Sequence, residues 1–294
     1  MKILVIGSDG QLGRCLKDCL NDINFDTFYN NSQELDVTNF LSTEEKISSL
    51  MPDVIINASA YTSVDLAESN KKEADTINFL AVKNLATISK KFNIILIHIS
   101  TDYVFDGKSE EFYTEECATN PQSAYGLSKL NGEKAIYNSK ANFIIIRTAW
   151  LFSEHGSNFL KTMISLLNDR DSLSMVSDQI GTPTYAQDLA KSIYSILIRI
   201  KNKNQKFGLY HFAGDSKCSW YEFASYICKE LIKIDNKYGA DIKAIATKDY
   251  PTPAKRPANS CLNSNKLCKS YNLAPSDWKK GVRESIKKMH LHRG

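Results

Sequence analysis

The sequence predicts an α/β fold built on a doubly wound parallel sheet, and three observations support this prediction. Short apolar segments of strand length alternate with segments of helical periodicity through the first half of the chain. Three of those strands are rich in isoleucine and almost continuously apolar, as expected for strands that helices cover on both faces. A glycine-rich turn at residues 7–13 joins the first strand to the first helix.

The predicted strands and crossover helices follow one another in order. The strands are KILVIG (2–7), FDTFYN (25–30), DVIINAS (53–59), IILIHIS (94–100) and FIIIRTA (143–149). The crossover helices are expected at 13–22, 38–50, 73–92 and 123–134. Such an alternation of parallel strands and helices is a Rossmann-type fold.

The regular alternation weakens after residue 150. Helices are expected at 157–169, within 179–200 after a Gly-Thr-Pro turn, and at 219–234, where Ser219 would be the N-cap. GLYHFA (208–213) reads as a strand, and three prolines make 249–263 extended. We therefore predict a Rossmann domain at 1–150 and a smaller C-terminal α/β lobe at 151–294, with some segments returning to the Rossmann core.

Composition excludes several classes of function. The net charge of +4 is small for 294 residues and the basic residues are scattered, so no nucleic-acid partner is expected. The sequence has no run of about 18 apolar residues, and MKILVIG turns polar at Ser8, so no membrane contact and a cytoplasmic location are expected. Seven dispersed cysteines without a CxxC pair indicate reduced thiols rather than disulfides or a zinc site.

The glycine-rich turn is the first candidate site. Gly7, Gly10 and Gly13 form a GxxGxxG pattern directly after a strand and at the start of a helix. Backbone without Cβ atoms lets a pyrophosphate approach closely, and a helix N-terminus offers free N–H groups and a positive dipole end. The pattern predicts a dinucleotide cofactor.

The residues beyond the second strand bear on which dinucleotide binds. The acidic residue that would bond an adenosine 2′-OH is absent, and Asn30 and Asn31 occupy that place. Arg14 would contact a 2′-phosphate or lie as an ordinary surface arginine, and both interpretations stand at this point. Asp36 follows a few residues later and would contact the adenine edge. We therefore expect NADPH or NADH without a preference.

The helix at 123–134 carries a second candidate site. Tyr125 and Lys129 are four residues apart and lie on the same helix face. A tyrosine with a pKa near 10 is a poor proton shuttle at neutral pH, and a nearby ammonium favours the phenolate. Lowering that pKa by roughly 3 units requires about 4 kcal/mol, which a lysine, a ribose hydroxyl and a second hydroxyl would share.

A hydroxyl stands where this chemistry needs one. Ser100, Thr101 and Asp102 follow the fourth strand, at the carboxyl end of the sheet, where open α/β folds bind ligands. Thr101 would hydrogen-bond a carbonyl oxygen while Tyr125 protonates it, and Lys129 would hold a nicotinamide ribose. The pattern predicts a hydride-transfer enzyme.

Taken together, GSDGQLG, NASAYTSVDLAES, STDYVFDG, YGLSK and RTAW make the sequence resemble the extended short-chain dehydrogenases. STDYVFDG with PTPAKRP is similar to the dTDP-4-dehydrorhamnose reductase branch, and DQIGTPT, GLYHFAG and DWKKGV extend the similarity nearly end to end. The resemblance implies a cofactor at a set of positions in the first three strand ends: Gly7, Gly10, Gln11, Leu12, Gly13, Asp36, Val37, Ala58, Ala60, Tyr61 and Thr62.

The resemblance also implies the reaction. Hydride would pass to C4 of a keto sugar, Tyr125 would donate the proton, and Thr101 and Lys129 would assist. Asp102 and Trp150 would hold the sugar of a dTDP-sugar substrate, and Arg256 would lie near its diphosphate. Core packing for Trp150 and a surface ion pair for Arg256 are the alternative interpretations.

Some members of this branch use acidic residues to bind magnesium at a dimer interface, one of them just after the glycine loop. Cys15 stands at that position here, and Asp188 alone matches another. One carboxylate does not make a magnesium site, so no metal is expected, and the chain would be a monomer or a homodimer.

Two other functions share these motifs. A regulatory subunit, such as one that modulates a methionine adenosyltransferase, would bind nucleotide without catalysis, and such proteins retain some of the same residues. A nucleotide-sugar epimerase or dehydratase would need further acid–base residues beside Thr101, where Asp102 supplies one carboxylate. The intact Thr101, Tyr125 and Lys129 favour the reductase.

Overall fold

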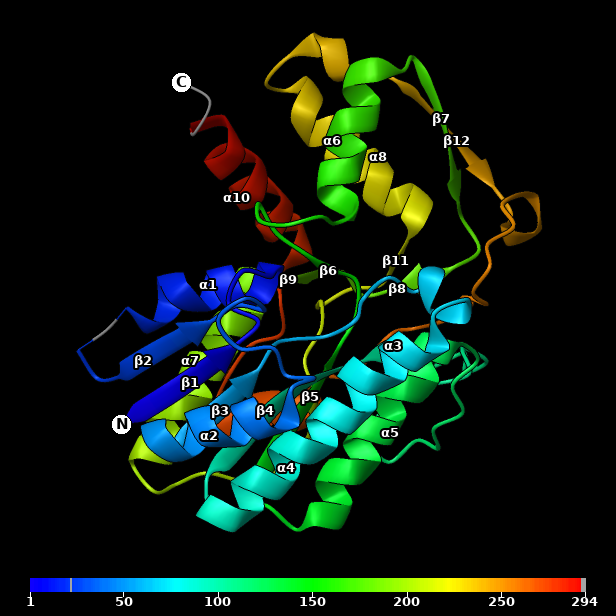
Figure 1. Ribbon diagram of the computed structural model, residues 1–294. Helices are drawn as coiled ribbons and strands as arrows, with labels where there is room; N and C mark the ends of the chain where they lie inside the picture. Colours follow the sequence, from blue (N-terminus) through cyan, green and yellow to red (C-terminus); the bar gives the residue numbers. More distant parts are fainter. Residues whose placement is uncertain (22, 292–294) are drawn as a thin grey trace.

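The computed structural model describes residues 1–21 and 23–291, and a six-stranded parallel sheet organises it (Figure 1). Residue 22, at the end of the first predicted helix, and residues 292–294, at the end of the predicted second lobe, lie outside the described residues. The strand order is β10-β5-β4-β3-β1-β2. This is the doubly wound Rossmann-type sheet that the sequence predicts.

The strands begin and end close to their predicted positions. They are β1 (Lys2–Ile6), β2 (Asp26–Asn30), β3 (Val54–Asn57), β4 (Ile95–Thr101), β5 (Phe143–Thr148) and β10 (Gly208–His211). The isoleucine-rich strands β3 and β5 are buried along nearly their whole length. Continuous burial of both strand faces explains why their sequences do not alternate between apolar and polar residues.

Helices cover both faces of the sheet. On one face, α1 (Gln11–Leu20) packs against α7 (Ala186–Lys201), and their apolar sides share a core with Ile3 and Val5. On the other face, turned toward the viewer in Figure 1, lie α2 (Phe40–Leu50), α4 (Ala81–Phe92) and α5 (Ala124–Ser139). The two helix layers keep water from the strands and leave the carboxyl edge of the sheet for ligands.

The helix predicted at 73–92 is made of three consecutive segments. These are α3 (Lys71–Asp75), the π-helical η2 (Thr76–Leu80) and α4. A π-helical turn inserts one extra residue per turn and changes where side chains point. Here it carries Asn78, which is buried and bonded to the loop after β3.

The chain returns to the sheet after its second lobe begins. Helix α7 lies against α1, β10 pairs with β5, and α9 (Asn265–Tyr271) packs beside β10. These segments come from the C-terminal half of the sequence yet complete the sheet and one of its helix layers.

The second lobe stands above the sheet in Figure 1 and contains α6 (Phe159–Asp169), α8 (Trp220–Ile232) and α10 (Trp278–Leu291). A parallel pair, β7 (Ser172–Val176) and β12 (Asp241–Ile245), flanks these helices. Four two-residue strands form two further small pairs: β6 (Leu151–Phe152) with β9 (Thr184–Tyr185), and β8 (Ile180–Gly181) with β11 (Cys218–Ser219). The predicted cap of α8 is confirmed, since Ser219 and Glu222 form a reciprocal capping box.

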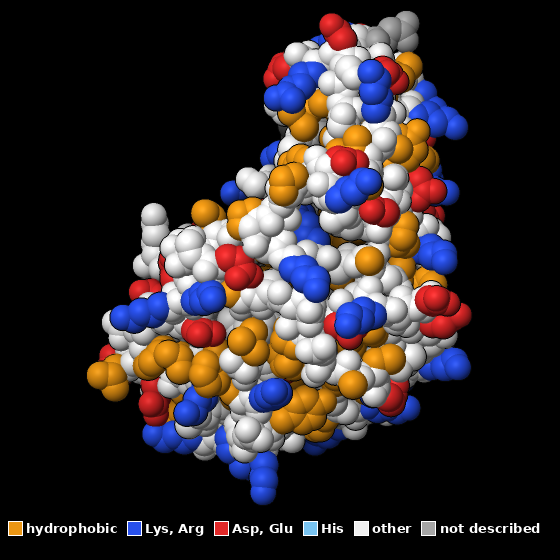
Figure 2. All heavy atoms as spheres, turned by 90° about the vertical axis from the view of Figure 1, so that its right-hand side faces the viewer, with side chains coloured by type: hydrophobic (Ala, Val, Ile, Leu, Met, Phe, Trp, Pro, Cys, Tyr) orange, Lys and Arg blue, Asp and Glu red, His pale blue; other side chains and the backbone are white. Residues whose placement is uncertain are grey.

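The surface carries no single-sign charge field on the face that Figure 2 shows, where basic and acidic side chains are interspersed over both lobes. Within the described residues, none of the helices is long and apolar enough to cross a bilayer.

Candidate active site

The glycine loop between β1 and α1 is shaped by two close backbone approaches. Gly7 has φ +81°, and a Cβ at this position would lie 2.7 Å from the Ser59 backbone nitrogen. A Cβ on Gly13 would lie 2.3 Å from the Gly7 carbonyl oxygen. The turn therefore needs glycine at both positions, which leaves the start of α1 open at the carboxyl edge of the sheet.

A cavity of about 350 Å³ lies over this loop. Among the residues predicted to bind a cofactor, it is lined by Gly7, Gly10, Ala58 and Ala60. Gly10 is the N-cap of α1 and has no side chain with which to cap the helix, so the first N–H groups face outward. The cradle fits a nucleotide diphosphate, because it offers open backbone, N–H donors and a positive dipole end.

The residues at the end of β2 close the other side of the loop. The Asn30 carbonyl accepts hydrogen bonds from the backbone N–H groups of Gly7 and Ser8, and Asn31 donates from Nδ2 to the Asp9 carboxylate over 2.9 Å. The exposed Arg14 donates from Nε to the Asp9 carbonyl oxygen over 3.0 Å, which holds it at the rim of the loop.

A larger cavity of about 800 Å³ adjoins this one and shares Ser32 with it. Asp36 lines this second cavity, while its Oδ1 accepts hydrogen bonds from the Thr38 backbone and hydroxyl at 2.9 and 2.7 Å. The two cavities together run along the carboxyl ends of β1 and β2. This is where the sequence predicts the adenosine half of the cofactor.

Three predicted cofactor residues point their side chains away from the cavities. Leu12 and Val37 are buried in the two cores that flank the sheet. The Gln11 side chain accepts a hydrogen bond from Asn158 of the second lobe at 2.9 Å. The side chains of Leu12 and Val37 are therefore unavailable to a cofactor, and the Gln11 side-chain oxygen is already paired.

The loop after β3 is fixed by buried amides. Asn78 accepts a hydrogen bond from the Tyr61 N–H at 2.9 Å and donates to the Tyr61 carbonyl at 3.0 Å. It also donates to the Ser128 hydroxyl of α5. Thr62 is exposed beside this anchored segment. The loop is thus tied to the same helix that carries Tyr125 and Lys129.

The Tyr125 phenol lies beside the Thr101 hydroxyl, which acts on its pKa as a hydrogen-bonding neighbour. Tyr125 is only 9% exposed and packs edge-on against the Tyr103 ring at 5.5 Å. Burial raises the pKa of Tyr125 to about 12, the Thr101 hydroxyl lowers it in part, and the Asp102 carboxylate adds to the rise. The phenol is therefore neutral at physiological pH.

This environment corrects the expectation that Lys129 lowers the pKa of Tyr125 in the protein itself. The Lys129 amino group donates to the Ile99 carbonyl over 2.7 Å and lies 3.4 Å from His98 Nε2. Burial lowers the pKa of Lys129 to about 8, against an opposing effect of Glu133. A proton donor in a reduction must be protonated before the hydride arrives, so a raised tyrosine pKa suits that direction of reaction.

Asp102 is buried beside this pair with one oxygen unused. Its Oδ1 accepts a hydrogen bond from the Thr101 hydroxyl at 2.9 Å, while Oδ2 has no partner among the described residues. Burial raises the pKa of Asp102 to about 6, although the hydrogen bond from the Thr101 hydroxyl lowers it in part. An unpaired buried acceptor in a site is suited to a ligand hydroxyl.

Trp150 joins the site to the second lobe. Its ring stacks on Trp220 with centroids 3.4 Å apart, and a Cβ on Gly181 would lie 2.3 Å from it. The backbone of Trp150 has φ +46°, which is unusual for a bulky residue. Stacking therefore fixes the Trp150 ring where the two lobes meet, and the strained backbone marks a position that its surroundings determine.

Arg256 forms the ion pair that was the alternative interpretation, with Asp65 at 2.9 Å. It also lines a cavity of about 220 Å³ in the second lobe, together with Trp220, Tyr250 and Gln179. The Arg256 Nε is buried without a partner in the described part of the chain. One donor of the guanidinium is thus left for a ligand.

A buried ion pair supports the catalytic helix and was not predicted. Glu133, one turn after Lys129, binds the Arg147 guanidinium through both oxygens, at 2.9 and 2.6 Å. Ser100 donates to the same carboxylate, and Arg147 lies over the Phe105 ring at 5.0 Å. The i, i+4 spacing from Lys129 was the sequence signal for Glu133, whereas nothing adjacent in the sequence points to Arg147.

The residues around Cys15 fit magnesium poorly. The Cys15 thiol is buried, and burial raises its pKa above the ordinary range. Asp188 instead accepts a hydrogen bond from Ser276 at 2.8 Å. Thiols in the neutral form are not ligands for a hard cation, so these residues offer one carboxylate.

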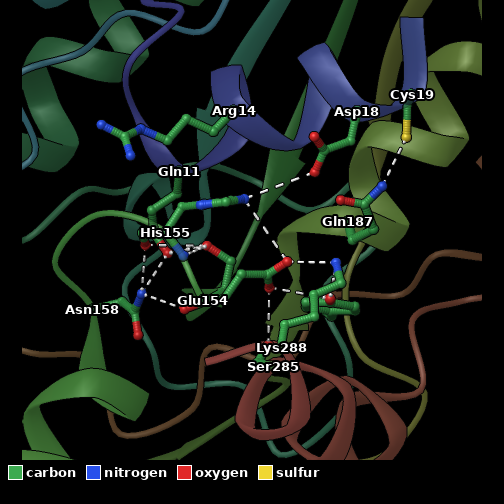
Figure 3. A network of polar contacts seen from close by, with 12 residues as sticks. Gln11, Arg14, Asp18, Cys19, Glu154, His155, Asn158, Gln187, Ser285 and Lys288 are labelled. Atoms are coloured by element: carbon green, nitrogen blue, oxygen red, sulfur yellow. Dashed lines mark hydrogen bonds and ion pairs between the residues drawn. The ribbon is translucent and has the colours of Figure 1, made fainter. Parts of the chain in front are cut away.

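A different cluster, Asp18, Glu154 and His155, lies between the lobes (Figure 3). The Lys288 ammonium of α10 binds Glu154, and His155 Nε2 lies 3.8 Å from the carboxylates of both Asp18 and Glu154. An ammonium already compensates the buried carboxylate and would repel a dication. We assign this cluster to the contact between α1, the residue 153–158 loop and α10.

Comparisons with known proteins agree with this geometry. The family described as RmlD substrate binding domain matches residues 1–291. A dTDP-4-dehydrorhamnose reductase from Aggregatibacter actinomycetemcomitans is 42% identical over 290 residues, with 96% of this chain and 97% of that protein covered.

Solved structures give the same result. The crystal structure of a dTDP-4-dehydrorhamnose reductase from Clostridium acetobutylicum has a TM-score of 0.91 and 37% identity, covering 99% of this chain and 100% of the other. That of the enzyme from Bacillus anthracis, in complex with NADP, has a TM-score of 0.88 and 32% identity, covering 98% and 99%.

Proposed function

Because this chain belongs to the dTDP-4-dehydrorhamnose reductase family, we propose that it reduces the C4 keto group of dTDP-4-dehydro-L-rhamnose to give dTDP-L-rhamnose. The product is an activated sugar for surface polysaccharide synthesis. The observation that carries the proposal is the contact between the Tyr125 phenol and the Thr101 hydroxyl, beside the orphaned Asp102 oxygen, at the carboxyl edge of the sheet.

A bound NADPH or NADH supplies the hydride in this reaction. Gly7, Gly10 and Gly13 keep the backbone of the loop open for its diphosphate, and Ala58 and Ala60 shape the cavity on the other side. The backbone of Gln11, Leu12 and Val37, and the side chains of Asp36, Tyr61 and Thr62, complete the predicted cofactor contacts. Lys129 is placed to hold the ribose.

Tyr125 holds the proton that the reduced oxygen receives. Its buried phenol stays protonated at neutral pH. The Thr101 hydroxyl has a single proton, which it gives to Asp102 in the free protein and would turn toward the developing negative charge when the keto group is bound. Thr101 is itself aligned by its bonds to Asp102 and to the Tyr103 N–H. The arrangement stabilises charge that appears only in the transition state.

The substrate contacts follow from the unused groups. Asp102 Oδ2 accepts a sugar hydroxyl, and the Trp150–Trp220 stack forms a flat wall for the sugar on the side of the second lobe. Arg256, at the cavity of about 220 Å³, binds the diphosphate of the dTDP moiety through the donors that Asp65 leaves free.

Three coarser features complete the proposal. The Rossmann domain spans 1–150, and the remainder, 151–294, forms mainly the substrate-binding lobe. All seven cysteines are free thiols, which suits a reducing cytoplasm. The protein acts as a monomer or homodimer on a dTDP-sugar, without nucleic acid, membrane or metal.

The test is oxidation of NADPH by the purified protein, followed by absorbance, with dTDP-4-dehydro-L-rhamnose generated enzymatically in the same cuvette. We expect rapid oxidation that depends on the sugar, and the same rate with EDTA, because the residues around Cys15 do not make a magnesium site. A repeat with NADH measures cofactor preference. NADPH binding without oxidation would contradict the proposal and favour a regulatory subunit. Oxidation only with another nucleotide sugar would show that dTDP-4-dehydro-L-rhamnose is not the substrate.

A further inference from the structure

A chain of buried polar side chains connects the loop after β3 to Lys129. Asn57 is the last residue of β3, and His98 is its register partner on β4. Both are buried to within 1% of completely, and so is Lys129 of α5, to 2%. Polar groups this deep in a protein need partners, so their hydrogen bonds determine which atom carries each proton.

The Ser59 backbone fixes the orientation of the Asn57 amide. The Ser59 N–H donates to Asn57 Oδ1 over 3.1 Å, and the Ser59 hydroxyl donates to the same oxygen over 2.6 Å. A backbone N–H can only donate, so the amide oxygen faces Ser59 and the amide nitrogen faces His98. Asn57 Nδ2 lies 3.1 Å from His98 Nδ1.

The fixed amide in turn selects the tautomer of His98. Because Asn57 Nδ2 only donates, His98 Nδ1 must accept and carries no proton. Burial and the Lys129 charge both lower the pKa of His98, so the ring is neutral and its proton is on Nε2. That N–H points at the Lys129 amino group, 3.4 Å away.

The two charge states of Lys129 respond differently to this N–H. An ammonium has no lone pair, so the His98 N–H opposes it. A neutral amine accepts the His98 N–H and still donates to the Ile99 carbonyl at 2.7 Å. The hydrogen bonds from Ser59 through Asn57 to His98 therefore end in an N–H donor that favours the neutral amine form of Lys129.

We propose that His98, oriented by Asn57, is a positioning residue that fixes the Lys129 amino group and sets the pH at which it becomes the ammonium that binds the cofactor ribose. The inference rests on the proposed function only for the role of Lys129 at the ribose. The hydrogen-bond chain thereby couples Ser59, which lines the cofactor cavity, to the charge of Lys129.

Other titratable groups face Lys129 and act on it as well. Tyr125 and Glu133 come from its own helix, and Glu133 favours the ammonium. Arg147 of β5 is bound to Glu133 and so weakens that effect. Burial, the largest influence, lowers the pKa of Lys129 to about 8. These groups are unchanged by a substitution at position 57, so the shift in a variant there that adds no charge reports the chain itself.

The test is the dissociation constant of NADPH, measured by fluorescence from about pH 6 to pH 10, a range that spans the lowered and the ordinary lysine pKa. Affinity should fall as the pH rises through the pKa of Lys129, because the ammonium is lost. Asn57→Asp keeps both bonds to Ser59 but accepts a hydrogen bond from His98 Nδ1–H, so Nε2 becomes an acceptor for the ammonium, and the added carboxylate favours the ammonium as well. We expect the inflection to move up by about one pH unit.

Asn57→Ala provides an independent route that adds no charge, because without the Asn57 amide His98 is free to carry its proton on Nδ1 and to accept from the ammonium through Nε2, and it carries the test if Asn57→Asp does not fold. Ser89→Ala, a buried hydroxyl of α4, is the control and should leave the inflection in place. An unchanged inflection in a folded variant, or no inflection in the wild type, would overturn the inference. The sugar-dependent oxidation assay tests the proposed function separately and does not enter this measurement.

Discussion

Replacing Tyr125 with phenylalanine isolates the proton donor. The ring keeps its edge-on contact with Tyr103 at 5.5 Å and its place among Ala67 and Ala74, so the packing of the site is retained. The lost hydroxyl leaves Thr101 with its bonds to Asp102 and to the Tyr103 N–H. The substitution removes one donor without creating a cavity.

The size of the effect follows from when the hydroxyl acts. A positioned general acid contributes typically 10²–10⁴ in rate, which corresponds to about 3–5 kcal/mol of transition-state stabilisation. Loss of one neutral hydrogen bond costs about 1 kcal/mol of folding stability. The phenol is protonated in the free protein because the pKa of Tyr125 is raised to about 12, so the wild-type rate should not fall through ionisation of this group at neutral pH.

Three measurements separate these effects. The rate of sugar-dependent NADPH oxidation should fall by about 10²–10⁴ in Tyr125→Phe, while the NADPH dissociation constant changes by less than about threefold. Thermal unfolding reports folding. Tyr137→Phe is the matched control, because Tyr137 is on the same helix but 47% exposed, and it should change none of these quantities. Turnover near the wild-type value in Tyr125→Phe would refute the assignment of the proton donor.

Three further predictions concern the surroundings of this tyrosine. Burial raises the pKa of Asp102 from 3.8 to about 6, so its ionised form costs the fold stability at neutral pH, and this cost is lost gradually as the pH falls from about 6 to about 3.8. Asp102→Asn should therefore raise stability at neutral pH by up to about 3 kcal/mol in denaturation, and raise the KM for the sugar in kinetic measurements. Lower stability with unchanged KM would contradict this. Glu133→Gln leaves the buried Arg147 guanidinium without a charge partner and should lower the free energy of unfolding, measured in urea, by about 3–5 kcal/mol. A decrease below about 1 kcal/mol would show that the pair is not buried in solution. Gly13→Ala should weaken both folding and NADPH binding, because the new Cβ would lie 2.3 Å from the Gly7 carbonyl oxygen. Gly10→Ala places its Cβ 3.4 Å from the same oxygen and should weaken NADPH binding alone. Equal stability of the two variants would contradict the close approach at Gly13.

The main sheet could be predicted because burial leaves a local signal. Strands covered on both faces are continuous apolar runs, so β3, β4 and β5 stand out in the sequence. The pair β7 and β12 gave no such signal, since β7 alternates buried with more exposed residues, β12 has no fully buried residue, and the two strands pair only with each other. The π-helical turn at Thr76–Leu80 was also missed, because the apolar spacing there fits an ordinary helix.

The site was predictable where chemistry depends on residues close in sequence. Tyr125, Lys129 and Thr101 follow from helix spacing and from the end of a strand. The Arg256–Asp65 pair joins segments far apart in the chain, so sequence reasoning had no reason to connect them. The direction of the Lys129 amino group could not be predicted either, because it is set by a hydrogen bond to the Ile99 carbonyl on another element.

The return of the chain to the main sheet has a consequence for biosynthesis. β5 ends at Thr148, but its outer neighbour β10 begins at Gly208, so about 60 residues must be made before the pair can form. At a synthesis rate of about 5–20 residues per second, the apolar edge of β5 stays open for roughly 3–12 s on the ribosome. During that interval it is a template for pairing with another nascent chain. Chains truncated between 150 and 207 should therefore aggregate in a translation extract, while the full chain stays in solution.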